Sequence, residues 1–306
     1  MRSAGVLMFL LAAAPGFSGA PVAEESSVPS MIVSTSWLAE CMEKEPASLV
    51  LLQVGPKEEY EAGHIPGAQH IMPADLGRDK DGVPLELLAD GDYEEILRSK
   101  GIGDKSRVVI YFGKDWVTPT ARVYWTLDYL GLAKQTAILD GGLPAWRAEG
   151  RAVSVETPKV ATGNYKLRTR PEIRVDADWV NSHCTSPEIA LVDTRTADFF
   201  SGENDGRGRY PRPGHIPGAS NIPYPNVIEK DLKFKDVESL RQIFRAADAG
   251  SGKRVVTYCH IGQQASLVYF IAKYLGYDAA MYDGSFTEWT LNELPVERSE
   301  SKSKPE

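Results

Sequence analysis

The amino-acid sequence predicts an α/β protein of two tandem domains, each with a parallel sheet flanked by helices. One observation behind this prediction is that short β-branched, apolar runs alternate with longer helical stretches, as in parallel sheets with helical crossovers. The other is an internal repeat: residues 63–68 read Gly-His-Ile-Pro-Gly-Ala, and residues 214–219 read the same. So long a spacing indicates a duplicated domain, because the units of solenoid proteins span only about 20–50 residues.

Further matches keep the same order in both halves of the chain. They are Val33 with Trp37 and Val175 with Trp179, Leu130-Gly131 and Leu275-Gly276, and Asp140-Gly141 with Trp146 and Asp283-Gly284 with Trp289. We therefore expect a first domain over residues 31–155, a linker over 156–171 and a second domain over 172–297. A charged tail over residues 298–306 is expected to be disordered.

Strands are expected over residues 48–54, 108–111 and 136–139 in the first domain. The expected strands of the second domain include residues 189–193, 255–258 and 279–282. Ser34 or Thr35 is expected to cap the helix that contains Cys41, and Asp176 the matching helix, which ends at Cys184.

Cys259 stands where an apolar strand ends and a Gly-containing loop begins, before a helix expected over residues 265–274. A thiol at such a turn faces unpaired backbone N–H groups and the positive end of a helix dipole. Both favour the thiolate, which is the nucleophilic form. Overlaying the two halves places Phe112 opposite Cys259, so only the second domain holds the thiol. The alternative interpretation is a small buried residue at a strand end.

Together these features resemble the tandem-domain rhodanese family, the thiosulfate and 3-mercaptopyruvate sulfurtransferases, over roughly residues 33–296. The resemblance implies two rhodanese-like domains, of which the first is catalytically silent, and a persulfide intermediate on Cys259. It implies an enzyme that moves a sulfane sulfur from a small anionic donor, thiosulfate, to cyanide or a thiol acceptor. The family chemistry needs no cofactor.

The loop after Cys259 departs from both loop types of that family. Thiosulfate-type loops usually carry basic residues there, and mercaptopyruvate-type loops read Gly-Ser-Gly-Val-Thr, so 3-mercaptopyruvate stays an alternative donor. We expect five residues to bind the donor through loop N–H groups, a partly cationic imidazole and amide side chains. They are His260, Ile261, Gly262, Gln263 and Gln264. Exposure at the start of a helix explains the two glutamines equally well.

Arg195 is the remaining candidate for donor binding. It follows the expected strand 189–193, at the end of the sheet where ligands bind in such folds. It can hold an anionic substrate, as an arginine near this place does in the family, or pair with Asp193; the sequence leaves both open. A second family arginine is replaced by Phe199, and basic residues follow later, at Arg207, Arg209 and Arg212.

His215 lies in the second copy of the repeated hexapeptide, which suggests a general base. The same hexapeptide surrounds His64 in the half without the thiol. A structural role explains both copies, so we expect both histidines to be structural.

Two other classes of protein compete with the sulfurtransferase interpretation. Cysteine phosphatases use a Cys-x5-Arg loop, in which the arginine clamps phosphate. Here Ala265 stands six residues after Cys259, so that charge is missing. A non-catalytic persulfide carrier or sensor remains open. The five histidines and three cysteines are not spaced as a zinc site, and no metal is expected.

The N-terminus differs in kind from the rest of the chain. Arg2 precedes an apolar stretch over residues 4–14 and then small residues, a pattern typical of a secretory signal, expected over residues 1–23. We therefore expect an exported protein, periplasmic or secreted. No later run is long enough for a membrane helix, so no membrane association is expected once the signal is cleaved. The net charge of −8 argues against binding nucleic acid.

Overall fold

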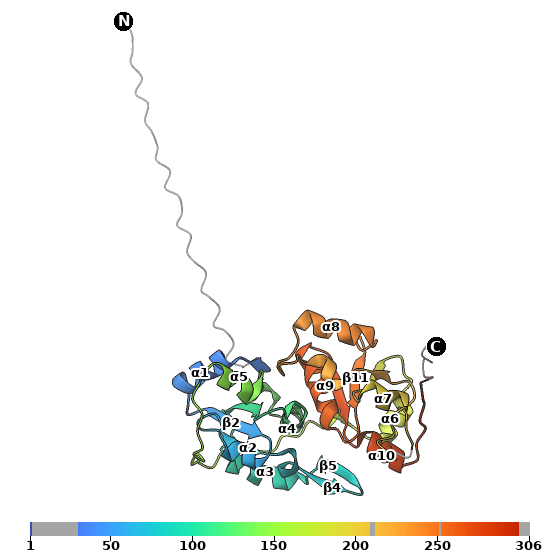
Figure 1. Ribbon diagram of the computed structural model, residues 1–306, viewed down its shortest axis with the longest axis horizontal. Coiled ribbons are helices and arrows are strands. Elements are labelled where there is room, and N and C mark those ends of the chain that lie inside the picture. The colour runs from blue at the N-terminus through green and yellow to red at the C-terminus, as the bar shows by residue number, and fades with distance from the viewer. Residues whose placement is uncertain (2–29, 209–211, 251, 300–306) are drawn as a thin grey trace.

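The structure is a computed structural model that describes residues 1, 30–208, 212–250 and 252–299 (Figure 1). Nearly all of the expected signal over residues 1–23, and the expected tail from residue 300 onward, lie outside the described residues.

Two five-stranded parallel sheets form the centres of the two domains, which lie side by side (Figure 1). The strand order is β1-β7-β6-β2-β3 in the first sheet and β8-β12-β11-β9-β10 in the second, so the two domains share one topology. A separate antiparallel pair, β4 and β5, belongs to the first domain. The expected α/β class with two parallel sheets is confirmed.

The elements of the first domain run from residue 32 to residue 148. They are β1 (Ile32–Val33), α1 (Thr35–Lys44), β2 (Leu49–Val54), α2 (Lys57–Glu61), β3 (Gln69–Ile71), β4 (Gly77–Lys80), β5 (Val83–Leu87), α3 (Asp90–Ser99), β6 (Arg107–Phe112), α4 (Val117–Tyr129), β7 (Thr136–Leu139) and α5 (Gly142–Ala148).

The elements of the second domain run from residue 174 to residue 291. They are β8 (Arg174–Val175), α6 (Ala177–His183), β9 (Ile189–Asp193), α7 (Ala197–Ser201), β10 (Ser220–Asn221), α8 (Val237–Ala246), β11 (Arg254–Tyr258), α9 (Gln263–Tyr274), β12 (Ala279–Tyr282) and α10 (Ser285–Leu291). Short 3-10 turns cover Pro73–Asp75, Ala133–Gln135, Pro171–Ile173 and Tyr224–Val227.

The six expected strands are present, with ends that shift by at most one residue. β1, β3, β8 and β10 were not predicted, because two or three residues are too few to show a hydrophobic period. The antiparallel pair β4 and β5 was not predicted either, since β4 reads Gly-Arg-Asp-Lys and has no apolar residue. Helix α9 begins at Gln263, two residues earlier than expected. The expected caps are found: Ser34 Oγ accepts from Trp37 N at 3.1 Å, and Asp176 Oδ1 accepts from Trp179 N at 2.8 Å.

Helices α4 and α9 join the two domains. Nearly every residue of α4 is buried, and one hydrophobic core runs from the first domain through α4 and α9 into the second. A helix buried on nearly all sides must be covered by other elements, here by its own sheet and by the partner helix, and its buried Arg122 and Asp128 are paired. The ring of Tyr124 packs edge-on against Phe270, with centroids 4.7 Å apart, across this boundary.

The β4–β5 pair extends beneath the second domain toward α10 (Figure 1). At its turn, a Cβ built on Gly82 would lie 3.7 Å from Leu291 Cδ1. The first domain therefore reaches the second through α4, through this hairpin, and at Asp140, whose Oδ1 accepts from Phe234 N at 2.9 Å.

The repeated hexapeptide forms the same structure twice. His64 stacks on Tyr60 and His215 stacks on Phe200, each with ring centroids 3.9 Å apart. His64 Nδ1 lies 2.9 Å from the Tyr60 carbonyl oxygen, and His215 Nδ1 lies 2.8 Å from that of Phe200. Both histidines therefore pack and bond in the same structural way, with or without a nearby thiol.

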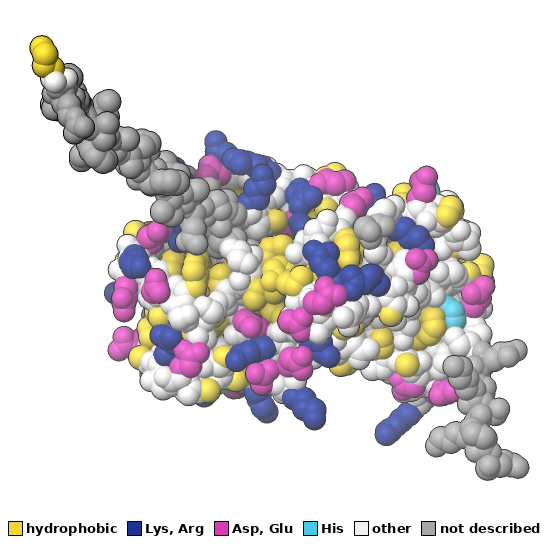
Figure 2. All heavy atoms as spheres, turned by 90° about the horizontal axis from the view of Figure 1, so that it is seen from above, with side chains coloured by type: hydrophobic (Ala, Val, Ile, Leu, Met, Phe, Trp, Pro, Cys, Tyr) yellow, Lys and Arg dark blue, Asp and Glu magenta, His cyan; other side chains and the backbone are white. Residues whose placement is uncertain are grey.

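The surface carries both signs of charge. Figure 2 shows Lys and Arg side chains interspersed with Asp and Glu over one face. Within the described part of the chain, no helix is long and apolar enough to cross a membrane.

Candidate active site

Cys259 lies at the carboxyl end of β11, the central strand of the second sheet. The loop that follows turns at Gly262, whose φ of 79° is left-handed, and α9 starts at the next residue. Only 1% of the surface of Cys259 is exposed. The residue thus sits under the start of a helix, at the end of the sheet where the sequence placed it.

Backbone N–H groups surround the Cys259 thiol. Those of Ala265, Ile261 and Gln264 bond to it, and they lower its pKa. Burial acts in the opposite direction and is the larger effect, so the pKa of Cys259 lies above its usual value. The sequence predicted that N–H groups at this turn favour the thiolate, and the three donors do so. Burial, which the sequence does not show, outweighs them.

Helix α10 holds the backbone of Cys259 in place. The Cys259 N–H donates to Ser285 Oγ at 3.2 Å, and its carbonyl oxygen accepts from Phe286 N at 3.0 Å. The carbonyl oxygen of His260 accepts from Thr287 N, also at 3.0 Å. Sequence reasoning missed Ser285. The available signal was that residues 140–142 read Asp-Gly-Gly whereas residues 283–285 read Asp-Gly-Ser.

Arg195 is 1% exposed and forms the ion pair that the sequence left open. Its Nε lies 3.0 and 3.1 Å from the two carboxylate oxygens of Asp193, and its Nη2 donates to the Gly214 carbonyl oxygen at 2.6 Å. The guanidinium covers the ring of Phe286 at 4.0 Å. Arg195 also lies close enough to Cys259 for their charges to interact. Its contact with a substrate stays a prediction.

The other predicted residues all belong to the Cys259 loop or to the first turn of α9. Ile261, Gln263 and Gln264 are half-buried, and Gly262 is buried. The ring of His260 meets Phe199 edge-on, with centroids 4.8 Å apart. The buried Oε1 of Gln264 has no hydrogen-bond partner among the described residues. Arg209, one of the three later arginines, lies outside those residues.

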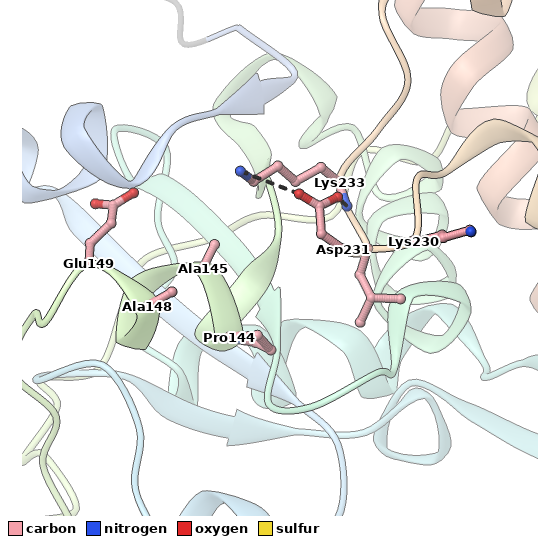
Figure 3. A pocket seen from close by; sticks show the side chains of 8 residues that line it. Pro144, Ala145, Ala148, Glu149, Lys230, Asp231 and Lys233 are labelled. Carbon is pink, nitrogen blue, oxygen red and sulfur yellow. Dashed lines mark hydrogen bonds and ion pairs between the residues drawn. The ribbon is translucent and has the colours of Figure 1, made fainter.

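A cavity of about 430 Å3 lies between the domains and away from the Cys259 loop (Figure 3). Residues of α5 line one side, and residues 230–233, including the pair Lys233 and Asp231, line the other. Cys259 does not line this cavity, and neither does any other residue of its loop. Among the described residues, no group of three or more His, Cys, Asp or Glu side chains could hold a metal ion.

A thiol beside backbone N–H groups, at the end of a central strand of the second sheet, is typical of a site for nucleophilic sulfur chemistry. The first domain of this duplicated α/β fold has Phe112 at the matching place. The family description "Rhodanese-like domain" matches residues 34–149 and again residues 176–292. The chain therefore belongs to the rhodanese family of sulfurtransferases, with two tandem rhodanese-like domains.

Relatives support the same assignment along most of the chain. A protein of Thermus thermophilus named "Sulfur carrier protein TtuD" is 35% identical over 89% of this chain and 98% of its own length. The "Thiosulfate sulfurtransferase" of Corynebacterium glutamicum is 31% identical over 94% of this chain and 97% of its own.

Solved structures show the same fold at lower identity. An EanB variant in complex with ergothioneine superposes with a TM-score of 0.78 at 22% identity, covering 89% of this chain and 71% of the other. The structure of YnjE gives a TM-score of 0.78 at 23% identity, covering 89% and 70%.

Proposed function

We propose that this protein is a thiosulfate sulfurtransferase that carries a sulfane sulfur on Cys259 and passes it to cyanide or a thiol. The observation that carries the proposal is the Cys259 thiol at the end of β11, held against three backbone N–H groups, one from the loop and two from the first turn of α9. The first domain has Phe112 at the matching place, so one site per chain is proposed.

The reaction has two displacement steps. The Cys259 thiolate attacks the outer sulfur of thiosulfate, the S–S bond of the donor breaks, and its electron pair leaves with sulfite. The product on the protein is a persulfide at Cys259. The backbone N–H groups stabilise the negative charge on sulfur in the Cys259 thiolate and in the Cys259 persulfide, as an oxyanion hole stabilises an oxyanion.

The second step returns the protein to its starting state. Cyanide or an acceptor thiolate attacks the outer sulfur of the persulfide and forms a bond to it. The bond to the inner sulfur breaks, and its electron pair returns to Cys259 as thiolate. The products are thiocyanate or an acceptor persulfide, and no oxidant, reductant or cofactor is consumed.

The choice of thiosulfate rests on charge. Thiosulfate is a compact dianion, and a buried guanidinium beside N–H donors favours such a ligand. Arg195 supplies that guanidinium within range of Cys259, with Asp193 as its partner. A relative 31% identical carries the name thiosulfate sulfurtransferase. 3-Mercaptopyruvate is the alternative donor, since the 260–264 loop fits neither family type.

A carrier role is the second candidate, because a relative 35% identical over 89% of this chain is named a sulfur carrier protein. A carrier accepts one sulfur and holds it until a protein partner removes it. Steady turnover of thiosulfate with small thiols or cyanide supports the enzyme, whereas one loading per chain without turnover supports the carrier.

We further propose that the protein is exported, on the strength of the signal pattern over residues 1–23. Expression of the full chain in a bacterial host, followed by fractionation and N-terminal sequencing, tests this. A chain recovered uncleaved from the cytoplasm contradicts it.

The experiment that tests the chemistry is intact-mass measurement after thiosulfate treatment. The wild-type chain should gain one sulfur, about 32 Da, at Cys259. Cys259→Ser should keep the fold and gain none, because a serine cannot hold a sulfane sulfur. Cys41→Ser and Cys184→Ser serve as matched controls and should load normally; a persulfide mapped to either residue rejects the proposal.

A further inference from the structure

A buried arginine of the first domain reaches the Cys259 loop of the second. Arg122 lies on α4 and is 2% exposed. Its Nη1 occupies the space beside Gly262, since a Cβ built on Gly262 would lie 2.5 Å from that nitrogen. Gly262 therefore has two reasons to be glycine, its left-handed φ and this close approach.

The guanidinium of Arg122 is fixed on three sides. Nη1 donates to Asp283 Oδ1 at 2.5 Å, and Nη2 donates to the Leu85 carbonyl oxygen at 2.5 Å, on the β4–β5 pair. Its flat face covers the ring of Trp125 at 4.5 Å. The planar fork of an arginine makes such contacts at fixed angles.

Arg122 contacts two residues of the second domain, Gly262 and Asp283, and each belongs to a segment that holds Cys259 in place. Gly262 closes the loop and opens α9, whose first turn supplies N–H groups to the thiol. Asp283 comes two residues before Ser285, which holds the Cys259 N–H. One side chain therefore connects both supports of the nucleophile.

We propose that Arg122 is a positioning residue for Cys259, supplied across the domain boundary by the domain that lacks the thiol. The inference deepens the proposed function and rests on it only in taking Cys259 as the reacting residue. It also gives the first domain a role in the reaction without any chemistry of its own.

Arg122 belongs to a network of ion pairs that crosses the domain boundary. Asp283 also faces Arg174, with 3.4 Å from Arg174 Nε to Asp283 Oδ2, and Arg174 Nη2 binds Glu86 at 2.7 Å. Two arginines and two carboxylates thus alternate, and a third carboxylate, Glu288, lies near enough to act on Glu86 and Arg174. Arg122 is held in this network with Nη1 against Gly262, so we infer that its effect on the thiol comes from where it holds the loop.

The chain offers a matched control on the same helix. Asp128 is fully buried on α4 and also pairs across the boundary, with Lys273, and its Oδ2 accepts from Tyr269 Oη at 2.7 Å. It stands six residues from Arg122, about 9 Å along the helix, and its side chain pairs with Arg170, Tyr269 and Lys273, which lie outside the Cys259 loop. Breaking this cluster loosens the boundary without touching Gly262.

The test compares full-length Arg122→Met, Arg122→Lys and Asp128→Asn. The main measurement is the rate of Cys259 alkylation by iodoacetamide against pH, read by peptide mass, which needs no sulfur donor. Thermal midpoints, and kcat and KM for thiosulfate, are measured alongside. We expect Arg122→Met to slow alkylation at pH 7 by about tenfold or more, one unit in pKa, with a matching fall in kcat.

Arg122→Lys should restore less than half of that rate, because an ammonium keeps the charge but loses the planar fork. Asp128→Asn should lower the thermal midpoint yet leave alkylation within about twofold of wild type. Equal slowing by Arg122→Met and Asp128→Asn, or full rescue by lysine, overturns the proposal. If Arg122→Met does not fold, Arg122→Lys decides alone: a Cys259 alkylation rate equal to that of wild type in this variant also overturns the proposal.

Absence of thiosulfate turnover in the wild-type chain counts against the proposed function alone. The alkylation rates still decide whether Arg122 positions Cys259.

Discussion

The hydroxyl of Ser285 accepts a hydrogen bond from the backbone N–H of Cys259 at 3.2 Å, and Ser285 does so from a left-handed backbone with φ of 54°. The first domain has Gly142 at the matching place, with φ of 55°. A Cβ on Gly142 would lie 2.6 Å from the ring of Phe112. The second domain therefore pairs the thiol of Cys259 with the hydroxyl of Ser285, whereas the first domain pairs the ring of Phe112 with Gly142.

Ser285→Gly should uncouple reactivity from stability. The lost hydrogen bond costs about 0.5–1.5 kcal/mol, and relief of the left-handed backbone returns about 1 kcal/mol or more. We expect the free energy of unfolding by urea to stay within about 1 kcal/mol of wild type, while the alkylation rate of Cys259 falls several-fold. Ser285→Ala keeps the backbone strain, so it should be the less stable of the two. Unchanged reactivity in both variants would show that the hydroxyl does not support Cys259.

Phe112→Cys should not create a second active site. Its loop carries Asp115, whose charge repels anionic donors, and Gly142 offers no hydroxyl to the new residue. Removing the buried ring should also destabilise the domain, by about 3–5 kcal/mol for a phenylalanine cut to a small side chain. The measurement is sulfur loading and turnover in the full-length double variant Phe112→Cys, Cys259→Ser. Thiosulfate turnover by that variant contradicts a catalytically silent first domain.

His215→Ala should weaken the fold more than the chemistry. It removes the contact of Nδ1 with the Phe200 carbonyl oxygen and the stacking on Phe200, and should cost about 1–3 kcal/mol in unfolding free energy. His64→Ala is the internal control in the other domain and should cost a similar amount. Urea denaturation and kcat are compared for both. A thousandfold loss of kcat at His215 with unchanged stability would make it a catalytic residue instead.

The reactivity of Cys259 should rise with pH without levelling off near neutrality. Burial raises its pKa above the usual value, so the thiolate fraction grows about tenfold per pH unit below that pKa. Alkylation rates from pH 6 to 9, with a free small thiol as control, measure this. A plateau below pH 8 would mean that the N–H groups outweigh burial after all.

Thiosulfate should be used at least tenfold better than 3-mercaptopyruvate, as kcat/KM at matched pH and salt; tenfold corresponds to about 1.4 kcal/mol in transition-state binding. Arg195→Lys should raise the thiosulfate KM more than Arg207→Lys, because lysine cannot reproduce the paired guanidinium. Added salt should raise KM, as exposed charges are screened over about 8–10 Å. A tenfold preference for 3-mercaptopyruvate rejects the donor assignment.

Much of the fold could be read from the sequence because its signals are local or repeated. The apolar runs at 189–193 and 255–258 mark central strands without knowledge of their partners. Two copies of one hexapeptide show the duplication, and they also explain His64 and His215 together. Strands β1, β3, β8 and β10 were not predicted because they exist only by pairing with longer neighbours. Strands β4 and β5 were not predicted either, because they pair only with each other and β4 is polar.

The sequence by itself determined the class of fold, the duplication and the difference between Cys259 and Phe112, since each depends on residue order alone. Only the tertiary structure decided the pairing of Arg195 with Asp193, the direction of the Cys259 pKa shift and the contact of Arg122 with Gly262. Burial and approach between distant segments set all three. Arg122 and Asp283 stand 161 residues apart, and no local pattern in the chain encodes their meeting.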